Sequence, residues 1–492
     1  MSLINVTNLT FAYDGSYDNV FENVSFQIDT DWKLGFTGRN GRGKTTFLNL
    51  LSGKYEYSGT ISTNINFEYF PYEVKDKEIN TIEVIKRICP DCMEWEIFRE
   101  ISMLDVAEDV LYRPFSTLSN GEQTKTLLAA LFLTSNSFLL IDEPTNHLDR
   151  IARKTVGNYL KKKHGFILVS HDRAFLDYCV DHILSINKTN IEIQKGNFSS
   201  WWENKQLQDQ FQLAENEKLK KDIARLSKAA KRNANWSNQV ESTKNGTTNS
   251  GSKLDKGYVG HKAAKMMKRS KVIEARQQEA IEKKSGLLKN LEENNSLRIC
   301  PLPYYSNCLL ELNEVSLSYG KKLVCENISF SINQGDRIAL SGKNGCGKSS
   351  ILKLICGEHI DYSGNLNLGN GLKISYIPQD TSHLSGSLST YAAEHGIDES
   401  LFKAILRKLD FQRVQFEKDI SEFSGGQKKK VLIAKSLCEK ANLYVWDEPL
   451  NFIDVLSRIQ IEDLILQYKP TLIFVEHDDT FCQNIATNII NL

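Results

Sequence analysis

Two glycine-rich segments carry the clearest chemical pattern in the chain. "GRNGRGKTT" at 38–46 and "GKNGCGKSS" at 342–350 both fit G-x-x-x-x-G-K-[ST]. In this pattern backbone N–H groups curl around phosphates, the lysine reaches the β- and γ-phosphates, and the hydroxyl residue holds Mg²⁺. Each segment follows a short apolar run and precedes a helical pattern, as the chemistry requires. The sequence therefore predicts two sites for ATP and Mg²⁺.

The two segments supply most of the predicted nucleotide contacts. In the first segment these are Gly38, Asn40, Gly41, Gly43, Lys44, Thr45 and Thr46. In the second segment they are Gly342, Asn344, Gly345, Gly347, Lys348, Ser349 and Ser350. Thr45 and Ser349 are also predicted ligands of Mg²⁺.

Acidic pairs follow two further apolar runs, in "LLIDEP" (139–144) and "YVWDEP" (444–449). Asp142 and Asp447 end predicted buried strands, which suits a carboxylate near Mg²⁺. Glu143 and Glu448 come next and could orient or deprotonate an attacking water. The alternative is that both pairs are ordinary acidic turn residues.

His171 and His477 follow the apolar runs "FILV" and "LIFV", and we expect them to contact the γ-phosphate. A lone histidine is more often structural, but the duplicated placement favours a catalytic role. Tyr13 and Tyr319 are candidates for stacking on adenine. Either tyrosine could equally be an ordinary surface or core residue.

All of these motifs occur twice, in the same order, at a separation of 304 to 306 residues. We therefore expect two copies of one domain, over 1–200 and 301–492, joined by residues 201–300. Apolar runs before polar loops predict buried parallel strands, and 3.6-residue patterns after them predict helices. The predicted fold class is α/β, with two tandem P-loop ATPase domains joined by an antiparallel α-helical hairpin.

The joining segment is basic and has helical periodicity. Apolar residues recur at three or four positions over 205–232 and every seven positions over 263–291, which predicts two antiparallel helices with a tip around 236–262. Residues 216–271 hold 15 Lys and Arg against 4 Asp and Glu, although the whole chain has a formal net charge of zero. The predicted RNA contacts are Trp236, Lys244, Lys253, Lys256, Tyr258, His261, Lys262 and Lys265. The alternative is a solvated spacer.

Bulk properties exclude several classes of protein. No run of about 18 apolar residues is present, which argues against a membrane span. The first residues lack the layout of a signal peptide. Ten cysteines in 492 residues, with one CxxC at Cys89 and Cys92, indicate reduced thiols rather than a disulfide scaffold. We expect a cytoplasmic protein.

The order of the P-loop, the segments "LSNGEQ" (118–123) and "FSGGQK" (423–428), the acidic strand end and the histidine resembles the signature set of ABC ATPases. The resemblance covers both halves. It implies that the domains face each other head to tail, so that each ATP lies between the P-loop of one copy and the signature of the other. The implied partners of the second P-loop are Ser119, Gly121, Glu122 and Gln379. Those of the first are Ser424, Gly425, Gly426 and Gln427.

Two fused domains with a charged helical linker and no membrane span resemble the ABC-F family. "GRNGRGKTT", "PLNFID" and "LDKGYVGHKAAKMM" resemble its antibiotic-resistance members of the Lsa type. That resemblance implies an ATPase that binds the bacterial ribosome at the tRNA exit site, contacting large-subunit rRNA and P-site tRNA. Its linker tip would promote release of lincosamides, streptogramin A and pleuromutilins from the peptidyl-transferase centre.

The same resemblance implies a monomer that needs no membrane and no obligate protein partner. Two alternatives stay open: a housekeeping ABC-F translation factor, and the ATPase component of a drug exporter. The interval between Tyr72 and Ser119 differs by two positions from its counterpart in the second copy, so the first domain has no sizeable extra arm.

Four departures from the family pattern predict two unequal sites. Tyr72 stands where the second copy has Gln379, Asn120 replaces a signature glycine, and Phe423 replaces the usual leucine. The second copy has "LNFID" where the first has the standard "TNHLD". The sequence does not tell which site hydrolyses faster.

Overall fold

The structure is a computed structural model that describes residues 2–13, 19–146, 148–187, 190–242, 265, 268, 272, 297–320, 322–343 and 345–492, with the side chains of 226, 229–242 and 322 excepted. The chain divides into two units. Met1–Trp201 and Asn294–Leu492 form the first, which contains both predicted ATPase copies. Trp202–Glu293 forms the second.

The first copy contains two sheets. A three-stranded antiparallel sheet has the order β2-β1-β4, with bounds Phe21–Asp29, Leu3–Phe11 and Ser58–Ser62. A six-stranded sheet has the order β5-β6-β7-β3-β8-β9, with bounds Asn66–Phe70, Ser137–Asp142, Phe166–Val169, Lys33–Thr37, His182–Asn187 and Asn190–Lys195. Its strands are parallel except for β9, which pairs antiparallel with β8.

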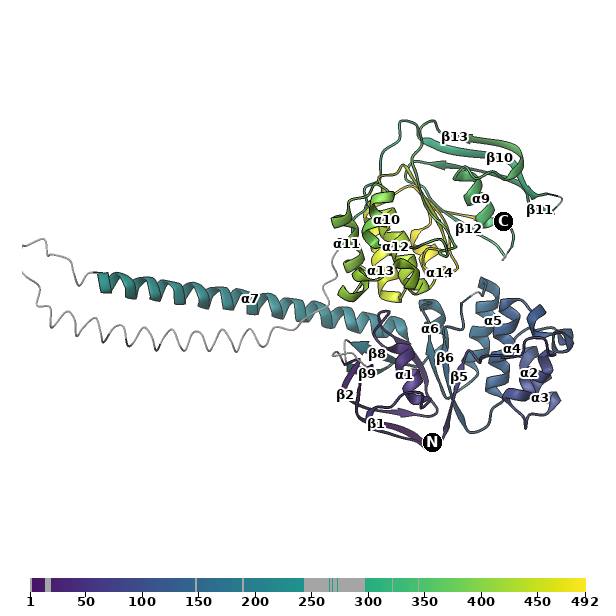
Figure 1. The fold of residues 1–492 in the computed structure, drawn as a ribbon, viewed down its shortest axis with the longest axis horizontal. Helices are drawn as coiled ribbons and strands as arrows, with labels where there is room; N and C mark the ends of the chain where they lie inside the picture. The colour runs from purple at the N-terminus through teal and green to yellow at the C-terminus, as the bar shows by residue number, and fades with distance from the viewer. Residues whose placement is uncertain are drawn as a thin grey trace, which may run out of the picture. The chain divides into compact units, whose positions relative to one another are not determined.

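The helices of the first copy fall between these strands. They are α1 (Lys44–Leu51), α2 (Thr81–Ile88), α3 (Glu94–Met103), α4 (Asn120–Phe132), α5 (Arg150–Lys161) and α6 (Arg173–Cys179). Figure 1 shows α2, α3 and α4 gathered into one helical group, where α4 contacts the other two. Between β5 and α4 the chain forms only α2, α3 and two short 3₁₀ turns, so this interval holds no extra arm.

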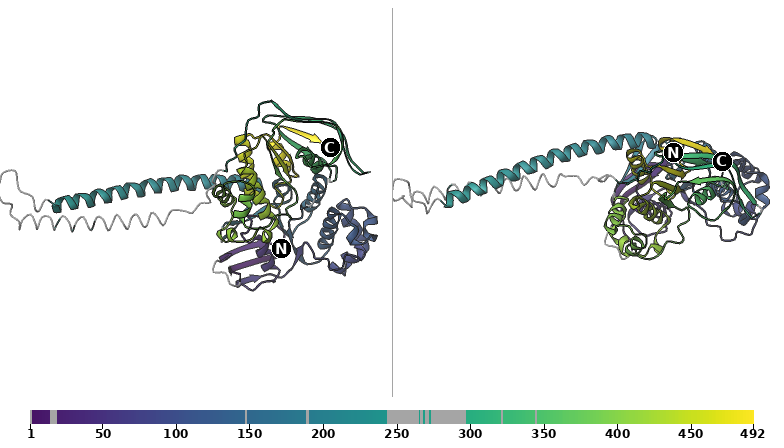
Figure 2. Two further views of the ribbon diagram at one scale, coloured as in Figure 1. Left: turned by 45° about the horizontal axis from the view of Figure 1, so that its top comes forward. Right: turned by 90° about the horizontal axis from the view of Figure 1, so that it is seen from above.

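The second copy repeats the plan. Its antiparallel sheet has the order β11-β10-β13, with bounds Lys322–Asn333, Cys308–Tyr319 and Asp361–Leu368. Its parallel sheet has the order β14-β15-β16-β12-β17, with bounds Ile374–Ile377, Leu443–Asp447, Leu472–Val475, Arg337–Ser341 and Asn488–Asn491. Its helices are α9 (Lys348–Ile355), α10 (Leu388–Glu394), α11 (Glu399–Lys408), α12 (Gly425–Cys438), α13 (Val455–Tyr468) and α14 (Asp479–Ile485), and α10 to α13 lie together in Figures 1 and 2.

The central strands are apolar on both faces because helices and the second sheet cover them. Every residue of β7, β15 and β16 is buried. Phe47 of α1 meets Phe21 and Phe36 nearly at right angles, with ring centroids 6.0 and 5.6 Å apart. Burial of each such ring stabilises the fold by about 1.5–3 kcal/mol. The predicted α/β fold with two tandem P-loop domains is confirmed.

The first linker helix is α7, Phe198–Ser242, which begins before and ends after the predicted 205–232. Phe198 and Trp201 at its start are buried. The backbone N–H of Ser199 donates to Asp177 Oδ1 of α6 at 2.7 Å, and its hydroxyl donates to Asp177 Oδ2. The first turn of α7 is therefore bound to the first ATPase copy.

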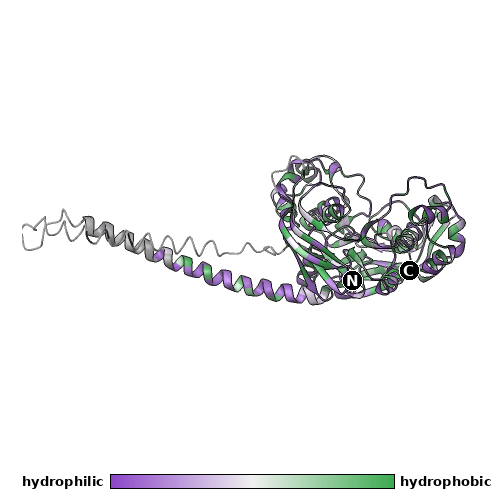
Figure 3. Cartoon of the chain, turned by 90° about the horizontal axis from the view of Figure 1, so that it is seen from below, coloured by the Kyte–Doolittle hydropathy of each residue, from purple (hydrophilic) through white to green (hydrophobic). Residues whose placement is uncertain are grey.

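Beyond this first turn, α7 is mainly hydrophilic, with single apolar residues between the charged ones (Figure 3). Leu207 and Phe211, which the periodicity assigns to an apolar seam, have exposed fractions of 65% and 71%. The partner helix predicted over 263–291 and the hairpin turn lie outside the described residues, apart from three isolated positions. The antiparallel hairpin therefore stays a prediction.

The predicted RNA contacts fall mostly in the same region. Trp236 lies within α7, and Lys265 is exposed. The others lie outside the described residues: Lys244, Lys253, Lys256, Tyr258, His261 and Lys262. No described helix is both long and apolar enough to cross a membrane.

Candidate nucleotide-binding sites

Both P-loops end in a glycine that the backbone requires. Gly43 and Gly347 precede α1 and α9 with φ of 94° and 97°, in the left-handed region. A Cβ at Gly43 would lie 2.6 Å from Val20 Cγ1, and one at Gly347 would lie 2.9 Å from Val324 Cγ1. Only glycine fits this turn, which aims the N-terminal N–H groups of each helix at one point. Such a helix start favours an anion.

Each P-loop lysine donates hydrogen bonds to backbone carbonyls of its own loop. Lys44 Nζ donates to the carbonyl of Gly38 at 2.7 Å, and Lys348 Nζ donates to the carbonyl of Gly342 at 2.9 Å. Both side chains are largely buried. Burial lowers the pKa of Lys44, although Asp454 of the other copy acts in the opposite direction. Each ammonium group is thus held at the concave side of its loop.

Asp142 ends β6 beside the first P-loop, as predicted. Its Oδ2 accepts hydrogen bonds from Thr45 Oγ1 and from the Tyr69 hydroxyl, both at 3.0 Å. Burial raises the pKa of Asp142, and the two hydrogen bonds oppose the shift. This carboxylate and the Thr45 hydroxyl provide the oxygen ligands that Mg²⁺ prefers.

Asp447 ends β15 in the matching position, but its carboxylate lacks the hydrogen bonds that Asp142 has. Asp447 is 1% exposed, and among the described residues neither of its carboxylate oxygens has a hydrogen-bond partner. Within the same part of the chain the hydroxyl of Tyr376, the counterpart of Tyr69, also has none. Burial raises the pKa of Asp447 to about 6, while the neighbouring Ser349 hydroxyl acts to lower it. Because an unpaired buried carboxylate is costly, a divalent cation between Asp447 and Ser349 fits these residues.

Each predicted catalytic glutamate lies beside the predicted histidine of its own copy. His171 Nε2 is 3.2 Å from Glu143 Oε1, and His477 Nε2 is 3.3 Å from Glu448 Oε1. The pairs meet because β6 with β7, and β15 with β16, are adjacent parallel strands that end at the same sheet edge. Burial holds the pKa of His171 well below its ordinary value, so this imidazole is neutral at pH 7.

The signature segments form the N-termini of α4 and α12. Ser119 caps α4 in a capping box with Glu122, and Ser424 caps α12 in a capping box with Gln427. Ser119 donates to Glu122 Oε2 from its hydroxyl at 2.7 Å and from its backbone N–H at 2.8 Å. The serine hydroxyls and the helix N–H groups therefore share one end of each helix, where an anion is stabilised.

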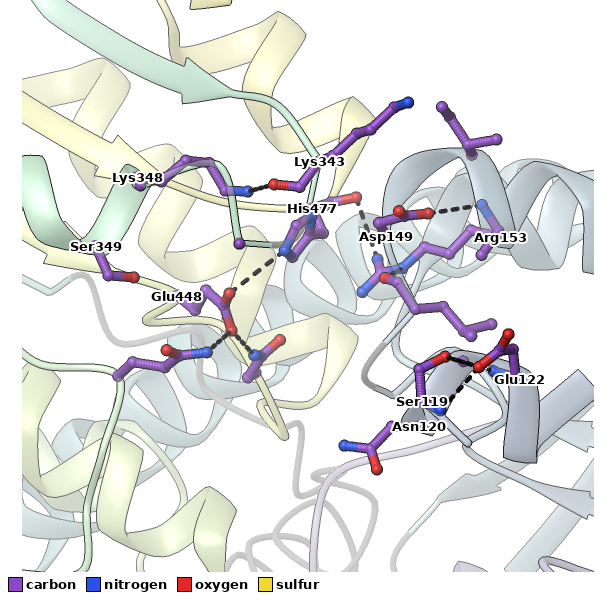
Figure 4. A pocket seen from close by; sticks show the side chains of 18 of the residues that line it. Ser119, Asn120, Glu122, Asp149, Arg153, Lys343, Lys348, Ser349, Glu448 and His477 are labelled. Carbon is purple, nitrogen blue, oxygen red and sulfur yellow. Dashed lines mark hydrogen bonds and ion pairs between the residues drawn. The ribbon is translucent and has the colours of Figure 1, made fainter. Parts of the chain in front are cut away.

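A cavity of about 850 Å³ joins the second P-loop to the first signature (Figure 4). Figure 4 shows Lys348, Glu448 and His477 on one side and Ser119 and Glu122 on the other. The predicted site residues that line it are Ser119, Gly121, Glu122, Gly345, Gly347, Lys348, Ser349, Ser350, Gln379, Glu448 and His477. The structure thus brings these residues together as the family resemblance implies. Asn344 lies outside the described residues.

A smaller cavity of about 390 Å³ joins the first P-loop to the second signature. Its predicted site residues are Asn40, Gly41, Thr45, Ser424, Gly425, Gly426 and Gln427. Asn40 Nδ2 donates to the carbonyl of Phe452 of the second copy at 2.8 Å, and Arg42 lies 3.6 Å from Asp410. A Cβ at Gly426 would lie 2.5 Å from that same Phe452 carbonyl oxygen. Phe452 is therefore packed between the two halves of this site.

Each candidate adenine platform is hydrogen-bonded to its own P-loop segment. The hydroxyl of Tyr13 lies 2.5 Å from Thr46 Oγ1, and that of Tyr319 donates to Ser350 Oγ at 3.2 Å. Each ring is thus bound to the residue directly after its P-loop motif, and both side chains are exposed. An exposed ring beside the phosphate loop can stack on a base, so both tyrosines remain predicted adenine contacts.

Three further residues were missed by the sequence motifs. Asn451 Nδ2 donates to Glu448 Oε2 at 2.5 Å. Arg153 Nη1 of the first copy donates to the backbone carbonyl of His477 in the second, at 3.1 Å, and to Asp172 Oδ2 at 3.1 Å. Of these two residues, the sequence could have pointed only to Asn451, because it belongs to the unusual "LNFID" segment.

The third is Glu476, which stands beside His477 where the first copy has Ser170. Its carboxylate accepts from the backbone N–H of Leu450 at 2.7 Å and from that of His477 at 3.2 Å. Burial raises the pKa of Glu476 to about 6, and Glu448 adds to the shift. A buried carboxylate thus bridges the two loops that carry Asn451 and His477.

Comparisons with known proteins agree with this architecture. The ABC transporter family profile matches residues 21–146 and 325–451, just over half of the chain. Three relatives are similar over most of their length. "ATP-binding protein Uup" of Buchnera aphidicola is 28% identical, over 99% of this chain and 80% of the relative. "Energy-dependent translational throttle protein EttA" of Escherichia coli K12 is 26% identical, over 96% and 89%. "Ribosome protection protein VmlR" of Bacillus subtilis is 27% identical, over 99% and 86%.

The fold also matches a solved structure. A complex containing "archaeal ribosome recycling factor aABCE1" aligns with a TM-score of 0.62 and 18% identity, over 98% of this chain and 87% of that one. At this identity the likeness concerns the fold, a tandem pair of ATP-binding domains. Domains of this kind take ATP together with Mg²⁺. The chain belongs to the ABC transporter family, in its ABC-F branch, and it is an ATPase.

Proposed function

We propose that this protein is an ATP-dependent ribosome protection factor. The observation that carries the proposal is the cavity that joins the P-loop of the second copy to the signature of the first. ATP bound there contacts both copies, so binding and hydrolysis change how the copies are held together. Similarity to a ribosome protection protein, VmlR, over 86% of its length and to a translational throttle protein, EttA, over 89% supports the ribosome as the target.

The proposed chemistry uses the residues around this cavity. The P-loop N–H groups and Lys348 bind the phosphates, and Ser349 with Asp447 would hold Mg²⁺, which neutralises charge on the transferred phosphoryl group. Glu448 orients and deprotonates the attacking water, and His477 contacts the γ-phosphate. Ser119 and the start of α4 bind the same phosphate from the other copy. In the first site Lys44, Thr45, Asp142, Glu143 and His171 have the matching roles.

The proposed target is the ribosomal tRNA exit site, with the linker as the part that reaches RNA. The excess of 11 positive charges over 216–271 suits a phosphate backbone. The tip around 236–262 would approach the peptidyl-transferase centre and promote release of lincosamides, streptogramin A and pleuromutilins. Hydrolysis would then release the factor.

Ribosome binding is tested by replacing Glu143 and Glu448 with Gln in one protein. With ATP, this variant is expected to sediment with ribosomes, because hydrolysis no longer releases it. The matched control is the same variant without nucleotide. If the double variant sediments free of ribosomes with ATP, the ribosome is not the target.

Drug release is tested in a purified translation system with drugs that act at the peptidyl-transferase centre. The wild type with ATP is expected to restore synthesis. A variant with Gly and Ser over 245–258 is expected to lose this effect and keep its ATPase activity. Equal rescue by both proteins would show that the tip has no part in drug release.

A second candidate is a housekeeping ABC-F translation factor, which the similarity to EttA over 96% of the chain supports. Such a factor would bind ribosomes in the same sedimentation experiment. It would give no rescue with any drug of the panel. The two experiments together therefore separate the candidates.

A further inference from the structure

We infer that the site built on the second P-loop is the faster ATP-hydrolysing site, and that Asn451 is a positioning residue for its base, Glu448. The inference rests on the proposed role of Glu448 as general base. It is carried by a difference between the two copies in how the corresponding glutamates are held.

Glu448 is fixed by three side chains from three different segments. Oε2 accepts hydrogen bonds from Gln379 Nε2 at 2.9 Å and from Asn451 Nδ2 at 2.5 Å. Oε1 lies 3.3 Å from His477 Nε2. Gln379 follows β14, Asn451 lies in the loop after β15, and His477 follows β16. A carboxylate held from three directions has a defined position before any substrate arrives, which is what proton transfer requires.

Glu143 in the first copy lacks the two amide donors. Its contact with histidine is equivalent, because His171 Nε2 lies 3.2 Å from its Oε1, but no side-chain amide of the described residues donates to it. Asn146 is the counterpart of Asn451, and its bond to Glu143 runs from backbone N–H to backbone carbonyl at 3.3 Å. Tyr72 occupies the position of Gln379, and its side chain is exposed. A tyrosine there replaces an amide donor with an aromatic ring.

The surrounding space differs as well. The second P-loop opens into the 850 Å³ cavity that Gln379, Asn451 and Glu448 line. In the smaller cavity, the Phe452 carbonyl accepts from Asn40 of the first P-loop and lies against Gly426 of the signature. Asn451 and Phe452 are consecutive, so the same segment holds the base of one site and packs into the other.

The step at the second site is a hydrolysis that needs no further reactant. The water oxygen forms a bond to the γ-phosphorus while the bond from that phosphorus to the β–γ bridging oxygen breaks. One water proton passes to the Glu448 carboxylate. ADP leaves with the electron pair of the broken bond, and Glu448 later returns its proton to solvent. Asn451 acts by keeping the accepting oxygen in place.

The test compares matched variants of the two copies in steady-state ATP hydrolysis by the full chain. Asn451→Ala is expected to lower kcat about tenfold, because the Glu448 carboxylate loses one of its two amide donors and with it part of its fixed position. The apparent KM for ATP should change by less than about threefold. Asn146→Ala is the control and is expected to leave kcat within about twofold of wild type.

Two further variants separate positioning from general damage. Asn451→Gln keeps an amide donor and is expected to recover part of the kcat that Asn451→Ala loses. Gln379→Ala removes the other amide donor to Glu448 and should also lower kcat with little change in KM, which provides a second variant if Asn451→Ala folds poorly. Equal loss of kcat in Asn451→Ala and Asn146→Ala, or an unchanged kcat in both donor variants, would overturn the inference.

The general-base role itself is checked with Glu448→Gln and Glu143→Gln. Glu448→Gln is expected to lower kcat by at least about 100-fold, and Glu143→Gln by a clearly smaller factor. A reversed order would overturn the inference but leave the general-base proposal in place. Unchanged hydrolysis in both variants would instead refute the proposed roles of the two glutamates.

Discussion

Arg173 of the first copy donates from Nη2 to Glu462 Oε2 of the second copy, at a distance of 2.5 Å. The two side chains are only 13% and 6% exposed, and Asn484 donates to the other oxygen of Glu462. The position of Glu462 is occupied by glycine in the first copy, Gly157, so the bond has no counterpart under the internal duplication. The contact between the copies is therefore not symmetric.

Breaking this ion pair should destabilise the protein. Glu462→Gln leaves the buried guanidinium of Arg173 without its counter-charge, and we expect a loss of about 3 kcal/mol in the free energy of unfolding. The measurement is denaturant unfolding of both proteins. The control is Glu94→Gln, which removes the exposed pair with Lys86 and should cost about 1 kcal/mol or less. Equal midpoints for Glu462→Gln and wild type would contradict this prediction.

The two signature glycines should respond differently to the same substitution. In Gly426→Ala the new Cβ would meet the Phe452 carbonyl oxygen at 2.5 Å, so backbone must shift, at a cost of about 1–3 kcal/mol. In Gly121→Ala the nearest atom, Leu148 Cδ2, is 3.7 Å away. Alanine there is expected to keep or raise stability, because it favours the helix. Thermal unfolding without nucleotide measures both, and a larger loss in Gly121→Ala would refute the packing argument.

Glu476 should make stability depend on pH. Its pKa of about 6 in the folded protein lies above the ordinary 4.5, so the folded state binds this proton more tightly than the unfolded state. The associated stability is fully present below pH 4.5 and is lost as pH rises through 6. Relative to Glu476→Gln, the wild type should therefore lose up to about 2 kcal/mol between pH 4.5 and 7. Denaturant unfolding across this range measures the difference, with Glu417→Gln, an exposed glutamate, as the control. A difference between wild type and Glu476→Gln that does not vary with pH would contradict the assignment.

Lys348 should contribute directly to nucleotide affinity. Lys348→Ala removes the ammonium group that the P-loop carbonyls hold, and we expect ATP binding at this site to weaken by a factor of about 10 to 100. Titration with a fluorescent ATP analogue measures the affinity. Lys440→Ala, at an exposed position of the same copy, is the charge-matched control. If both variants bind the analogue as tightly as wild type, Lys348 does not contact the phosphates.

The sequence motifs predicted those site residues whose positions depend only on the strand or loop that carries them. A P-loop, a strand that ends in aspartate and a following histidine strand place Lys348, Asp447 and His477 at one sheet edge without further information. The fold class followed from the same strands. The sequence did not reveal the tertiary contacts, because Asn146 and Asn451 are the same residue type at matching positions. Among the described contacts the side chain of Asn451 binds a glutamate, whereas that of Asn146 does not.

The linker helix shows another limit of periodicity. The spacing of apolar residues indicated 205–232, but α7 begins at Phe198. The added turn is stabilised by Asp177, which is distant in sequence, and by burial of Phe198 and Trp201 against the first copy. A pattern confined to the helix itself cannot reveal a capping residue from another helix.

The bond between Asp177 and Ser199 gives α6 two attached ends. At its start, Asp172 caps the helix and binds Arg153, which also binds the backbone of His477 in the other copy. At its end, Asp177 holds the first turn of α7. A helix of only seven residues therefore connects the backbone of His477 in the second copy, by way of Arg153 and Asp172, to the first turn of α7.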